Sequence, residues 1–282
     1  MRRNTRMEIR PISGALGAEI LGVDLAAGVD DETFARIRGT FLEHGVIVIR
    51  DQDLTPEQHL AAARRFGPIN INRFFTPVDG HPEVAEVRKE PDQKQNVGGR
   101  WHTDHSYDDA PALGSMIYAI DVPPAGGDTL FANMSLAFET LSDGMKAMLS
   151  KLEAVHSSRH VFGPGYKSNP DLSDRFRNAE QAVQDAVHPV VIRHPDTGRR
   201  VLYVNPIFTV RFDGWTEEES KPLLDFLYTH AARPEFSCRV RWEKGSLGLW
   251  DNRGTWHMAL NDYHGHRRLM HRVTIEGAPL SA

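Results

Sequence analysis

The chain has 282 residues, a formal net charge of −5 and a single cysteine, Cys238. Because its basic residues are scattered and outnumbered by acidic ones, we expect no nucleic-acid partner and no attraction to an anionic membrane surface. One cysteine excludes an internal disulfide and favours a reducing cytoplasm. No run of about 18 apolar residues occurs and no apolar stretch follows the basic start, so we expect neither a membrane span nor a signal peptide.

The N-terminal part of the chain predicts short strands followed by two helices. Two β-like segments within 8–23 precede a helix that opens at Asp30-Asp31-Glu32 and runs through about His44, and its apolar residues recur near helical spacing. A buried strand is expected at 46–49. Thr55-Pro56-Glu57-Gln58 then combines an N-cap, a proline at the first helical position and a capping-box partner, which predicts a helix over 56–66. His59 on this helix is expected at the surface or at its boundary.

The middle of the chain alternates strands with irregular segments. Strands are expected at 83–87, 115–120 and 129–131, and a helical region at 135–153 with Ser135 and Ser142 as N-caps. Residues 157–185 are polar, contain Gly163-Pro164-Gly165 and lack a strand pattern. A segment of this length between strands is typical of a lid or of a surface excursion.

The C-terminal third predicts a hairpin, a helix and further strands. A second capping box, Thr216-Glu217-Glu218-Glu219, opens a helix to about residue 230, with Phe226 among its expected buried residues. Many strands separated by short turns, with helices at the start and in insertions, favour a single, mainly β domain over 1–282, an antiparallel barrel or jelly roll with flanking helices. The expected elements are a hairpin of 187–193 with 200–205, and strands at 236–242, 246–250 and 271–277.

A histidine and an aspartate stand two positions apart in Trp101-His102-Thr103-Asp104. In an extended strand such residues share a face, so both side chains can reach one point. Two ligands hold a metal poorly, and we place a third at His257, within 250–257. Two neutral imidazoles and one carboxylate on one face of a metal form the triad typical of non-haem Fe(II) in oxygen chemistry.

Two other pairs in the chain have similar spacing. His194-Pro195-Asp196 runs into Thr197-Gly198 between two apolar runs, which is typical of a hairpin turn. His81-Pro82-Glu83 follows Asp79-Gly80, another turn signal. Since the chain holds 14 histidines, the pair at 102 and 104 needs the C-terminal segment for its support.

Several blocks follow one another in a defined order and spacing: Gly14–Ile20, Trp101–Asp104, Gly126–Leu130, Trp250–His257 and Arg267–Arg272. In these blocks, over nearly its whole length, the chain resembles the taurine dioxygenase (TauD/TfdA) family of Fe(II)- and 2-oxoglutarate-dependent dioxygenases. The resemblance implies a double-stranded β-helix (jelly roll) core. It also implies Fe(II) as the metal, 2-oxoglutarate and O₂ as cosubstrates, and hydroxylation of a substrate with release of succinate and CO₂.

The resemblance also assigns roles to individual residues. It makes the three residues of the triad the iron ligands, which are then the catalytic centre. Arg268 takes the place of the residue that binds the distal carboxylate of 2-oxoglutarate, a task that suits a guanidinium. Thr129 supports the same carboxylate, or is an ordinary strand residue. Arg272 matches the arginine that holds the anionic group of the substrate, and its alternative is a structural ion pair.

The expected substrate pocket departs from that of the taurine-oxidising members. Asn72 stands near their histidine, Phe75 near their tyrosine and Gly98 near their asparagine, while His105 replaces an aliphatic residue. Polar contacts to taurine are therefore missing, and Phe74, Phe75 and Phe208 offer an apolar wall. The chain also resembles the aryloxyalkanoate-cleaving members in Val155–Gly163 and Cys238–Trp242, so an organic acid or a sulfonate other than taurine is the expected substrate.

Three alternatives remain open on the sequence: a taurine or alkylsulfonate dioxygenase proper, an inactive metal-free jelly-roll binding protein, and a zinc hydrolase. His, Asp and His can hold zinc, but a hydrolase leaves Arg268 without a role. Members of the family often form dimers or tetramers, so we expect a homo-oligomer.

Overall fold

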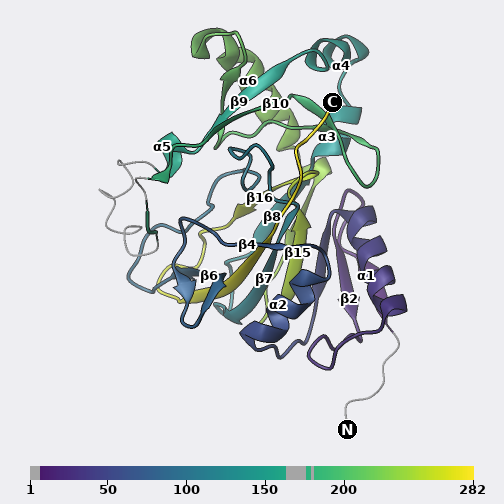
Figure 1. The fold of residues 1–282 in the computed structure, drawn as a ribbon, viewed down its shortest axis with the longest axis vertical. Helices are drawn as coiled ribbons and strands as arrows, with labels where there is room; N and C mark the ends of the chain where they lie inside the picture. The colour runs from purple at the N-terminus through teal and green to yellow at the C-terminus, as the bar shows by residue number, and fades with distance from the viewer. Residues whose placement is uncertain (1–6, 163–175, 179–180) are drawn as a thin grey trace.

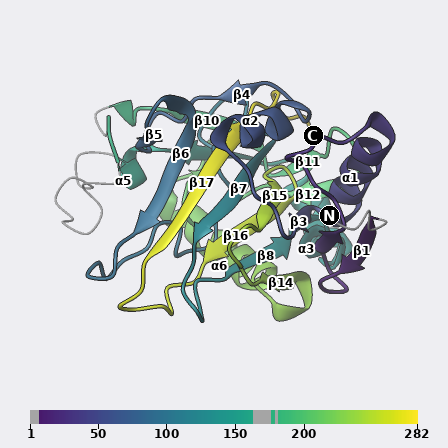
Figure 2. The same cartoon turned by 90° about the horizontal axis from the view of Figure 1, so that it is seen from below.

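The structure, a computed structural model, describes residues 7–162, 176–178 and 181–282. Two β-sheets face each other, helices cover the outer face of the larger sheet, and a second layer of helices and short strands covers the smaller one (Figures 1 and 2). Within these described ranges, no helix has the length and apolar character needed to cross a bilayer.

The larger sheet has nine strands and is antiparallel except for the pairing of β2 with β3. Its central strands lie side by side in Figure 2. In spatial order its strands are β1 (Glu8–Pro11), β2 (Ala18–Leu21), β3 (Val46–Ile49), β15 (Leu247–Asp251), β7 (Gly114–Asp121), β17 (Arg268–Ile275), β6 (His81–Lys89) and β5 (Pro77–Val78), with β4 (Ile69–Asn70) paired to β17.

The smaller sheet that faces it has the order β14-β8-β16, and two further small sheets lie beyond it. The strands β11 and β12 form the expected hairpin, whereas β10 pairs with β9 instead. The strands are β8 (Thr129–Asn133), β9 (Glu153–Ser157), β10 (Asp185–Pro189), β11 (Val191–Arg193), β12 (Arg200–Leu202), β13 (Thr209–Phe212), β14 (Ser237–Val240) and β16 (Thr255–Ala259).

Strand β3 shows how the sequence builds the two layers. All four of its residues are buried, and they alternate between the two faces of the larger sheet. Val46 and Val48 pack between the sheets, whereas Ile47 and Ile49 pack under the helices α1 (Asp31–His44) and α2 (Pro56–Arg64). This alternation explains why the sequence of a strand covered on both sides is continuously apolar.

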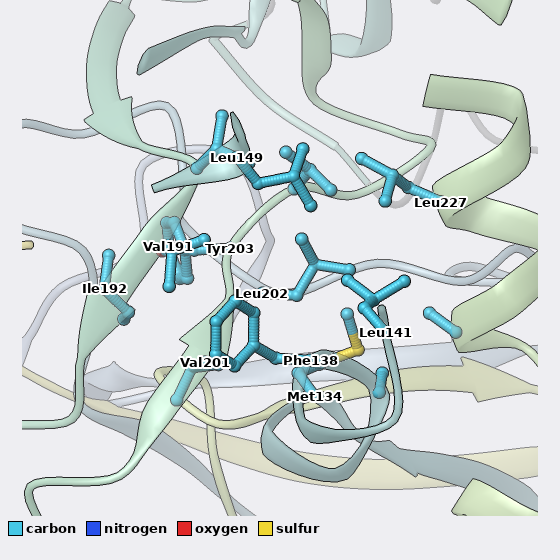
Figure 3. Close-up of a cluster of buried hydrophobic side chains, with 14 of the residues drawn as sticks. Met134, Phe138, Leu141, Leu149, Val191, Ile192, Val201, Leu202, Tyr203 and Leu227 are labelled. Atoms are coloured by element: carbon cyan, nitrogen blue, oxygen red, sulfur yellow. The ribbon is translucent and has the colours of Figure 1, made fainter. Parts of the chain in front are cut away.

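A third apolar cluster lies behind the smaller sheet (Figure 3). Trp256 of β16 joins this cluster, and its indole N–H donates to the carbonyl of Val204 at 2.8 Å. The next residue, His257, points to the opposite face and therefore into the space between the sheets. The helices of this part are α3 (Met134–Glu139), α4 (Asp143–Leu149), α5 (Arg159–Phe162), α6 (Glu217–Ala231) and the 3₁₀ turn η3 (Pro234–Phe236).

Several expectations were wrong in detail. The helical region expected at 135–153 is two short helices, and Asn133, not Ser135, caps the first by accepting the N–H of Leu136 at 3.0 Å. Ser142 caps the second, as predicted. Phe226 is 48% exposed, because it lies on the outer side of α6 from Leu224 and Leu227.

Strand β16 was not predicted as a strand. The turn at 252–254 separates it from β15, so the segment 250–257 is not one element. In the expected lid, 157–185, the described parts are the end of β9, α5, 176–178, 181–184 and the start of β10. Residues 163–175 and 179–180 lie outside the described residues, and the lid stays a prediction.

We predict that Thr216→Ala destabilises the fold by about 1 kcal/mol, because it removes the side chain that accepts the N–H of Glu219 at the start of α6. Urea unfolding followed by circular dichroism measures the loss. Thr229→Ala is the matched control in the same helix, since its hydroxyl bonds only to the carbonyl of Asp225 in the exposed helix interior. Equal effects of the two variants would contradict the assignment of the cap.

Candidate active site

His102 and His257 are brought together by the main chain. The N–H of His102 donates to the carbonyl of His257 at 3.0 Å, and the N–H of His257 donates back at 2.8 Å, which makes an isolated antiparallel bridge. Asp104 lies in a turn, not in the extended strand that we expected. His105, with φ of 61°, turns the chain there, so the carboxylate reaches the imidazoles through a turn and not through strand alternation.

The triad is a buried donor set of metal-binding size. One ligand atom from each of His102, Asp104 and His257 lies within 4.8 Å of the others. The two imidazole Nε2 atoms lie 3.7 and 3.8 Å from the carboxylate oxygens of Asp104, which is too far for hydrogen bonds. Nδ1 of His102 lies 2.7 Å from the carbonyl of Arg100, to which it donates, so its Nε2 keeps a lone pair facing the other two donors. These donors fit a divalent iron.

The electrostatics keep the triad in its ligating form. Burial lowers the pKa of both imidazoles, since a charge is disfavoured away from water. Burial by itself would raise the pKa of Asp104, but Arg272 and the two imidazoles outweigh it and the pKa is lowered. Neutral imidazoles and an ionised carboxylate are the forms that bind a metal.

A cavity of about 610 Å³ opens beside the triad. Ten residues predicted for the site line it, and they come from five separate parts of the chain. Beyond the three triad residues, they are Thr129, Arg268, Arg272, Asn72, Phe75, His105 and Phe208.

Arg268 and Thr129 present donors to this cavity. Arg268 is 6% exposed, and its Nε donates to the carbonyl of Gly127 at 3.0 Å, which leaves the end of the guanidinium free to bind a carboxylate. Burial lowers the pKa of Arg268, since a charge is disfavoured away from water, and no carboxylate of the described residues bonds to it to offset this effect. Thr129 accepts the indole N–H of Trp242 at 2.9 Å, so its own hydroxyl proton remains available.

Arg272 lies four residues along β17, on the same side as Arg268. One of its terminal nitrogens is 3.4 Å from Oδ2 of Asp104, and its guanidinium carbon is 4.3 Å from the centre of the Phe75 ring. Ser115 donates to the same oxygen of Asp104 at 2.9 Å. Ser115 could not be identified from the sequence, because an isolated serine in a strand carries no motif.

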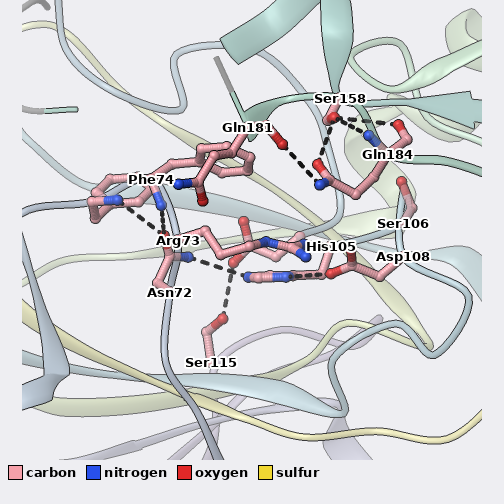
Figure 4. Close-up of polar contacts among 12 residues, drawn as sticks. Asn72, Arg73, Phe74, His105, Ser106, Asp108, Ser115, Ser158, Gln181 and Gln184 are labelled. Atoms are coloured by element: carbon pink, nitrogen blue, oxygen red, sulfur yellow. Dashed lines mark hydrogen bonds and ion pairs between the residues drawn. The ribbon is translucent and has the colours of Figure 1, made fainter. Parts of the chain in front are cut away.

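A hydrogen-bonded chain fixes the polar side of the cavity (Figure 4). The carboxamide oxygen of Asn72 accepts the N–H groups of Phe74 and Phe75 at 2.9 and 3.0 Å, so its nitrogen faces Nε2 of His105 at 3.3 Å. An amide nitrogen can only donate, so Nε2 accepts, and Nδ1 donates to Asp108 at 3.0 Å. Arg73 holds the other oxygen of Asp108. The roles of Arg73 and Asp108 were missed, since charged residues of two different loops show no common spacing.

Aromatic rings form the opposite wall of the cavity. Phe208 packs edge-on against Tyr107 with ring centres 4.9 Å apart, and Phe75 packs against Phe176 at 4.6 Å. Phe162 also lines the cavity. Phe74, also predicted for the apolar wall, does not line the cavity. It is buried, and its ring stacks on the ring of Phe162 with centres 4.4 Å apart.

His194 and Asp196, the pair that we interpreted as part of a turn, support the segment that leads to His257 of the triad. Nε2 of His194 lies 3.0 Å from Oδ2 of Asp251, and Arg253 bonds Asp251 through two nitrogens at 2.7 and 2.8 Å. Arg253 also donates to Asp196 at 2.7 Å. This buried cluster ties the β11–β12 hairpin to the turn that leads into β16, so the turn interpretation is confirmed and gains a structural role. His81 pairs with Glu57 at the surface, far from any metal ligand.

We predict that Asp251→Asn destabilises the fold by about 3 kcal/mol at neutral pH, because it leaves the buried Arg253 without its carboxylate. Burial alone would raise the pKa of Asp251, but its bonds to Arg253 and His194 outweigh it and lower the pKa to about 2. Because its pKa is lower in the folded state, ionised Asp251 stabilises the fold above the unfolded-state pKa of about 4. This stabilisation is lost as the pH falls toward 2.

The difference between wild type and Asp251→Asn should therefore narrow below about pH 4, as measured by urea unfolding at successive pH values. Asp225→Asn is the control, since Asp225 makes an exposed pair with Lys221 whose loss costs about 0.5 kcal/mol or less. A difference that stays constant from pH 7 to pH 3 would contradict the prediction.

The fold and this site define a class: a two-sheet β protein with a buried His, Asp, His cluster that can hold a metal, beside a cavity that holds two buried guanidinium groups. A family model described as "Taurine catabolism dioxygenase TauD, TfdA family" matches residues 8–274. The chain belongs to this family and is an Fe(II)- and 2-oxoglutarate-dependent dioxygenase with the expected jelly-roll core.

Known relatives cover nearly the whole chain. An alkylsulfatase of Acinetobacter baylyi is 32% identical over 275 residues, which cover 96% of this chain and 86% of that protein. An (S)-phenoxypropionate/alpha-ketoglutarate-dioxygenase of Sphingobium herbicidovorans is 32% identical over 284 residues, with coverages of 97% and 96%. The crystal structure of a taurine dioxygenase from Burkholderia xenovorans superposes with a TM-score of 0.81 at 37% identity, with coverages of 96% and 91%.

Proposed function

We propose that His102, Asp104 and His257 hold Fe(II), that Arg268 and Thr129 anchor 2-oxoglutarate, and that Arg272 binds the anionic group of the substrate. The observation that carries this proposal is the presence of two buried guanidinium groups in the cavity that contains the triad. A buried cation needs an anionic partner. Arg268 has none among the described residues, and Arg272 has only the long contact with Asp104.

Each group then has a defined task in the reaction. Bound Fe(II), with 2-oxoglutarate, supplies the oxidant from O₂ while the keto acid is converted to succinate and CO₂. Arg268 orients the keto acid through its distal carboxylate, and Thr129 adds a hydroxyl donor. Arg272 holds the substrate anion close to the triad, so a carbon near the anionic group is brought to the reacting centre. The aromatic wall excludes water from that carbon.

The lining of the cavity favours an organic anion with an apolar body. Arg272 and the amide of Asn72 are donors, and the rings of Phe75, Phe162 and Phe208 are apolar. Asp104 is the one acidic residue among the described residues that line the cavity. An ammonium group, as in taurine, would therefore find no carboxylate partner other than the metal ligand.

We infer that the substrate is an organic acid, an aryloxyalkanoate-like acid, a sulfate ester or a sulfonate other than taurine. The names of the relatives, an alkylsulfatase and a phenoxypropionate dioxygenase, support the first three of these classes. Taurine and other alkylsulfonates are the alternative, which the name of the Burkholderia structure supports.

A succinate-release screen with Fe(II), ascorbate and 2-oxoglutarate tests the substrate class. We predict that hexyl sulfate or 2-phenoxypropionate raises succinate release well above the rate without substrate, whereas taurine does not, because the cavity provides no partner for an ammonium group. Detection of an aldehyde with free sulfate, or of phenol with pyruvate, would identify hydroxylation next to the ester or ether oxygen. Taurine as the best substrate would contradict the proposal and support the alternative.

Site variants test the assigned roles in the same assay. We predict that His102→Ala, Asp104→Ala and His257→Ala each abolish turnover and lower bound iron. Arg268→Ala should raise the KM for 2-oxoglutarate about 10–150-fold with a smaller change in kcat, because a charged hydrogen-bond partner is lost.

Arg267→Ala is the matched control for Arg268→Ala. Arg267 precedes β17, is exposed, and pairs with Glu90 and Asp121. Normal turnover by His257→Ala would overturn the iron site. Failure of the wild-type protein to bind Fe(II) after anaerobic loading would favour a metal-free binding protein, and hydrolysis with zinc but no succinate release would favour a zinc hydrolase.

We also propose that the protein is a homo-oligomer, a dimer or tetramer, of the cytoplasm. The single cysteine, Cys238, is buried and unpaired, which suits a reducing compartment. Membership of a family whose members often assemble supports the oligomer. Light scattering coupled to size-exclusion chromatography gives the mass directly, and a mass near that of one chain would contradict the oligomer.

A further inference from the structure

Arg272 contacts both the cavity proposed for the substrate and Asp104 of the proposed metal site. Its side chain lines the cavity, and its NH1 lies 3.4 Å from Oδ2 of Asp104. Both residues are more than nine-tenths buried, at 7% and 8% exposure. A charge on one side of this contact is therefore felt on the other with little screening by water.

We propose that Arg272 couples binding of the substrate anion to binding of the metal, so that each strengthens the other. The inference rests on the proposed function, because it takes the triad as the metal site and Arg272 as the anion site. It goes further in making the guanidinium a positioning group for the metal ligand and not only a substrate contact.

The sign of the coupling follows from the charges. A guanidinium close to Asp104 repels a divalent cation held by that carboxylate and competes for its oxygen. An anion bound to Arg272 neutralises the guanidinium and removes both effects, so the metal binds more tightly. By linkage, the metal tightens anion binding by the same factor.

The contacts of Arg272 and Asp104 allow the guanidinium to turn from the carboxylate to a bound anion. Nε of Arg272 is buried and has no hydrogen-bond partner among the described residues, so the guanidinium keeps a donor for an incoming anion. Ser115 donates to Oδ2 of Asp104 at 2.9 Å, so the carboxylate stays fixed when Arg272 turns to the anion. The ring of Phe75 packs against the guanidinium, with the guanidinium carbon 4.3 Å from the ring centre.

The test measures Co(II) affinity by competition with a chelating dye at pH 8, without 2-oxoglutarate. The probe is hexyl sulfate, and 1-hexanol is its uncharged counterpart. We expect hexyl sulfate to lower the dissociation constant of Co(II) about fivefold or more, since coupling between sites typically spans 5–150-fold. We expect 1-hexanol to leave the dissociation constant unchanged, because it fills the cavity without neutralising Arg272.

Variants of Arg272 separate coupling from a structural role. Arg272→Gln should bind Co(II) more tightly than wild type in the absence of anion and should lose the effect of hexyl sulfate. If Arg272 were needed only for structure, its replacement would instead weaken Co(II) binding. Arg272→Lys keeps the charge, so it should keep both the lower affinity and the response to hexyl sulfate.

Arg100→Gln is the matched control. Arg100 also lines the cavity, but its side chain is exposed and donates to the carbonyl of Pro206, away from Asp104. It should retain the response to hexyl sulfate. Circular dichroism establishes that each variant is folded before its metal affinity is compared.

An unchanged Co(II) affinity in the presence of hexyl sulfate would overturn the inference, as would a retained response in Arg272→Gln. These outcomes differ from failure of the proposed function. Turnover without coupling would reject the inference alone, and coupling without succinate release from any substrate would reject the proposed activity alone.

Discussion

The paired main-chain hydrogen bonds between His102 and His257 are the contact on which the site depends. They join a loop from the first half of the chain to a strand from the last quarter, and they do so through backbone groups, so side-chain chemistry is left free for ligation. The ligand geometry follows from this bridge, because it places the two imidazoles side by side with ring centres 4.1 Å apart. The cluster of His194, Asp251 and Arg253 holds the turn before β16 in place and so fixes the register of the bridge.

The cavity is rich in hydrogen-bond donors and poor in carboxylates, which suits the proposed binding of two anions. Thr129, Arg268 and Arg272 supply strand-borne donors, and Asp104 of the triad is the one carboxylate among the described residues that line the cavity. In the proposed function, separate cations bind the keto acid and the substrate anion side by side. The orientation of Asn72, fixed by two backbone N–H groups, extends the same donor character to the loop side of the cavity.

The sequence predicted the composition of the site well and its geometry less well. His102, Asp104, His257, Arg268 and Arg272 could be found because the family resemblance combines several blocks, and each block has a spacing that chemistry requires. The route by which Asp104 reaches the imidazoles could not be found, since it depends on a left-handed backbone conformation at His105, and such a conformation is uncommon for any residue other than glycine.

Partners outside the blocks escaped prediction for a related reason. Ser115 and Trp242 contact site residues only after the sheets have closed, and such tertiary contacts leave no local pattern. His59 is another example. It was expected at the surface or its boundary, but it is 1% exposed, because α2 turns it toward the ring of Tyr118 in the larger sheet.

The groups that line the cavity divide according to the elements that carry them. His257, Thr129, Arg268 and Arg272 stand on strands, whereas Asn72, Phe75, His105 and Phe208 stand on loops or at their ends. Loops accept substitution and insertion more readily than packed strands do. The same rigid frame could therefore acquire new substrate preferences through exchange of its loops, while the oxidative machinery is inherited intact.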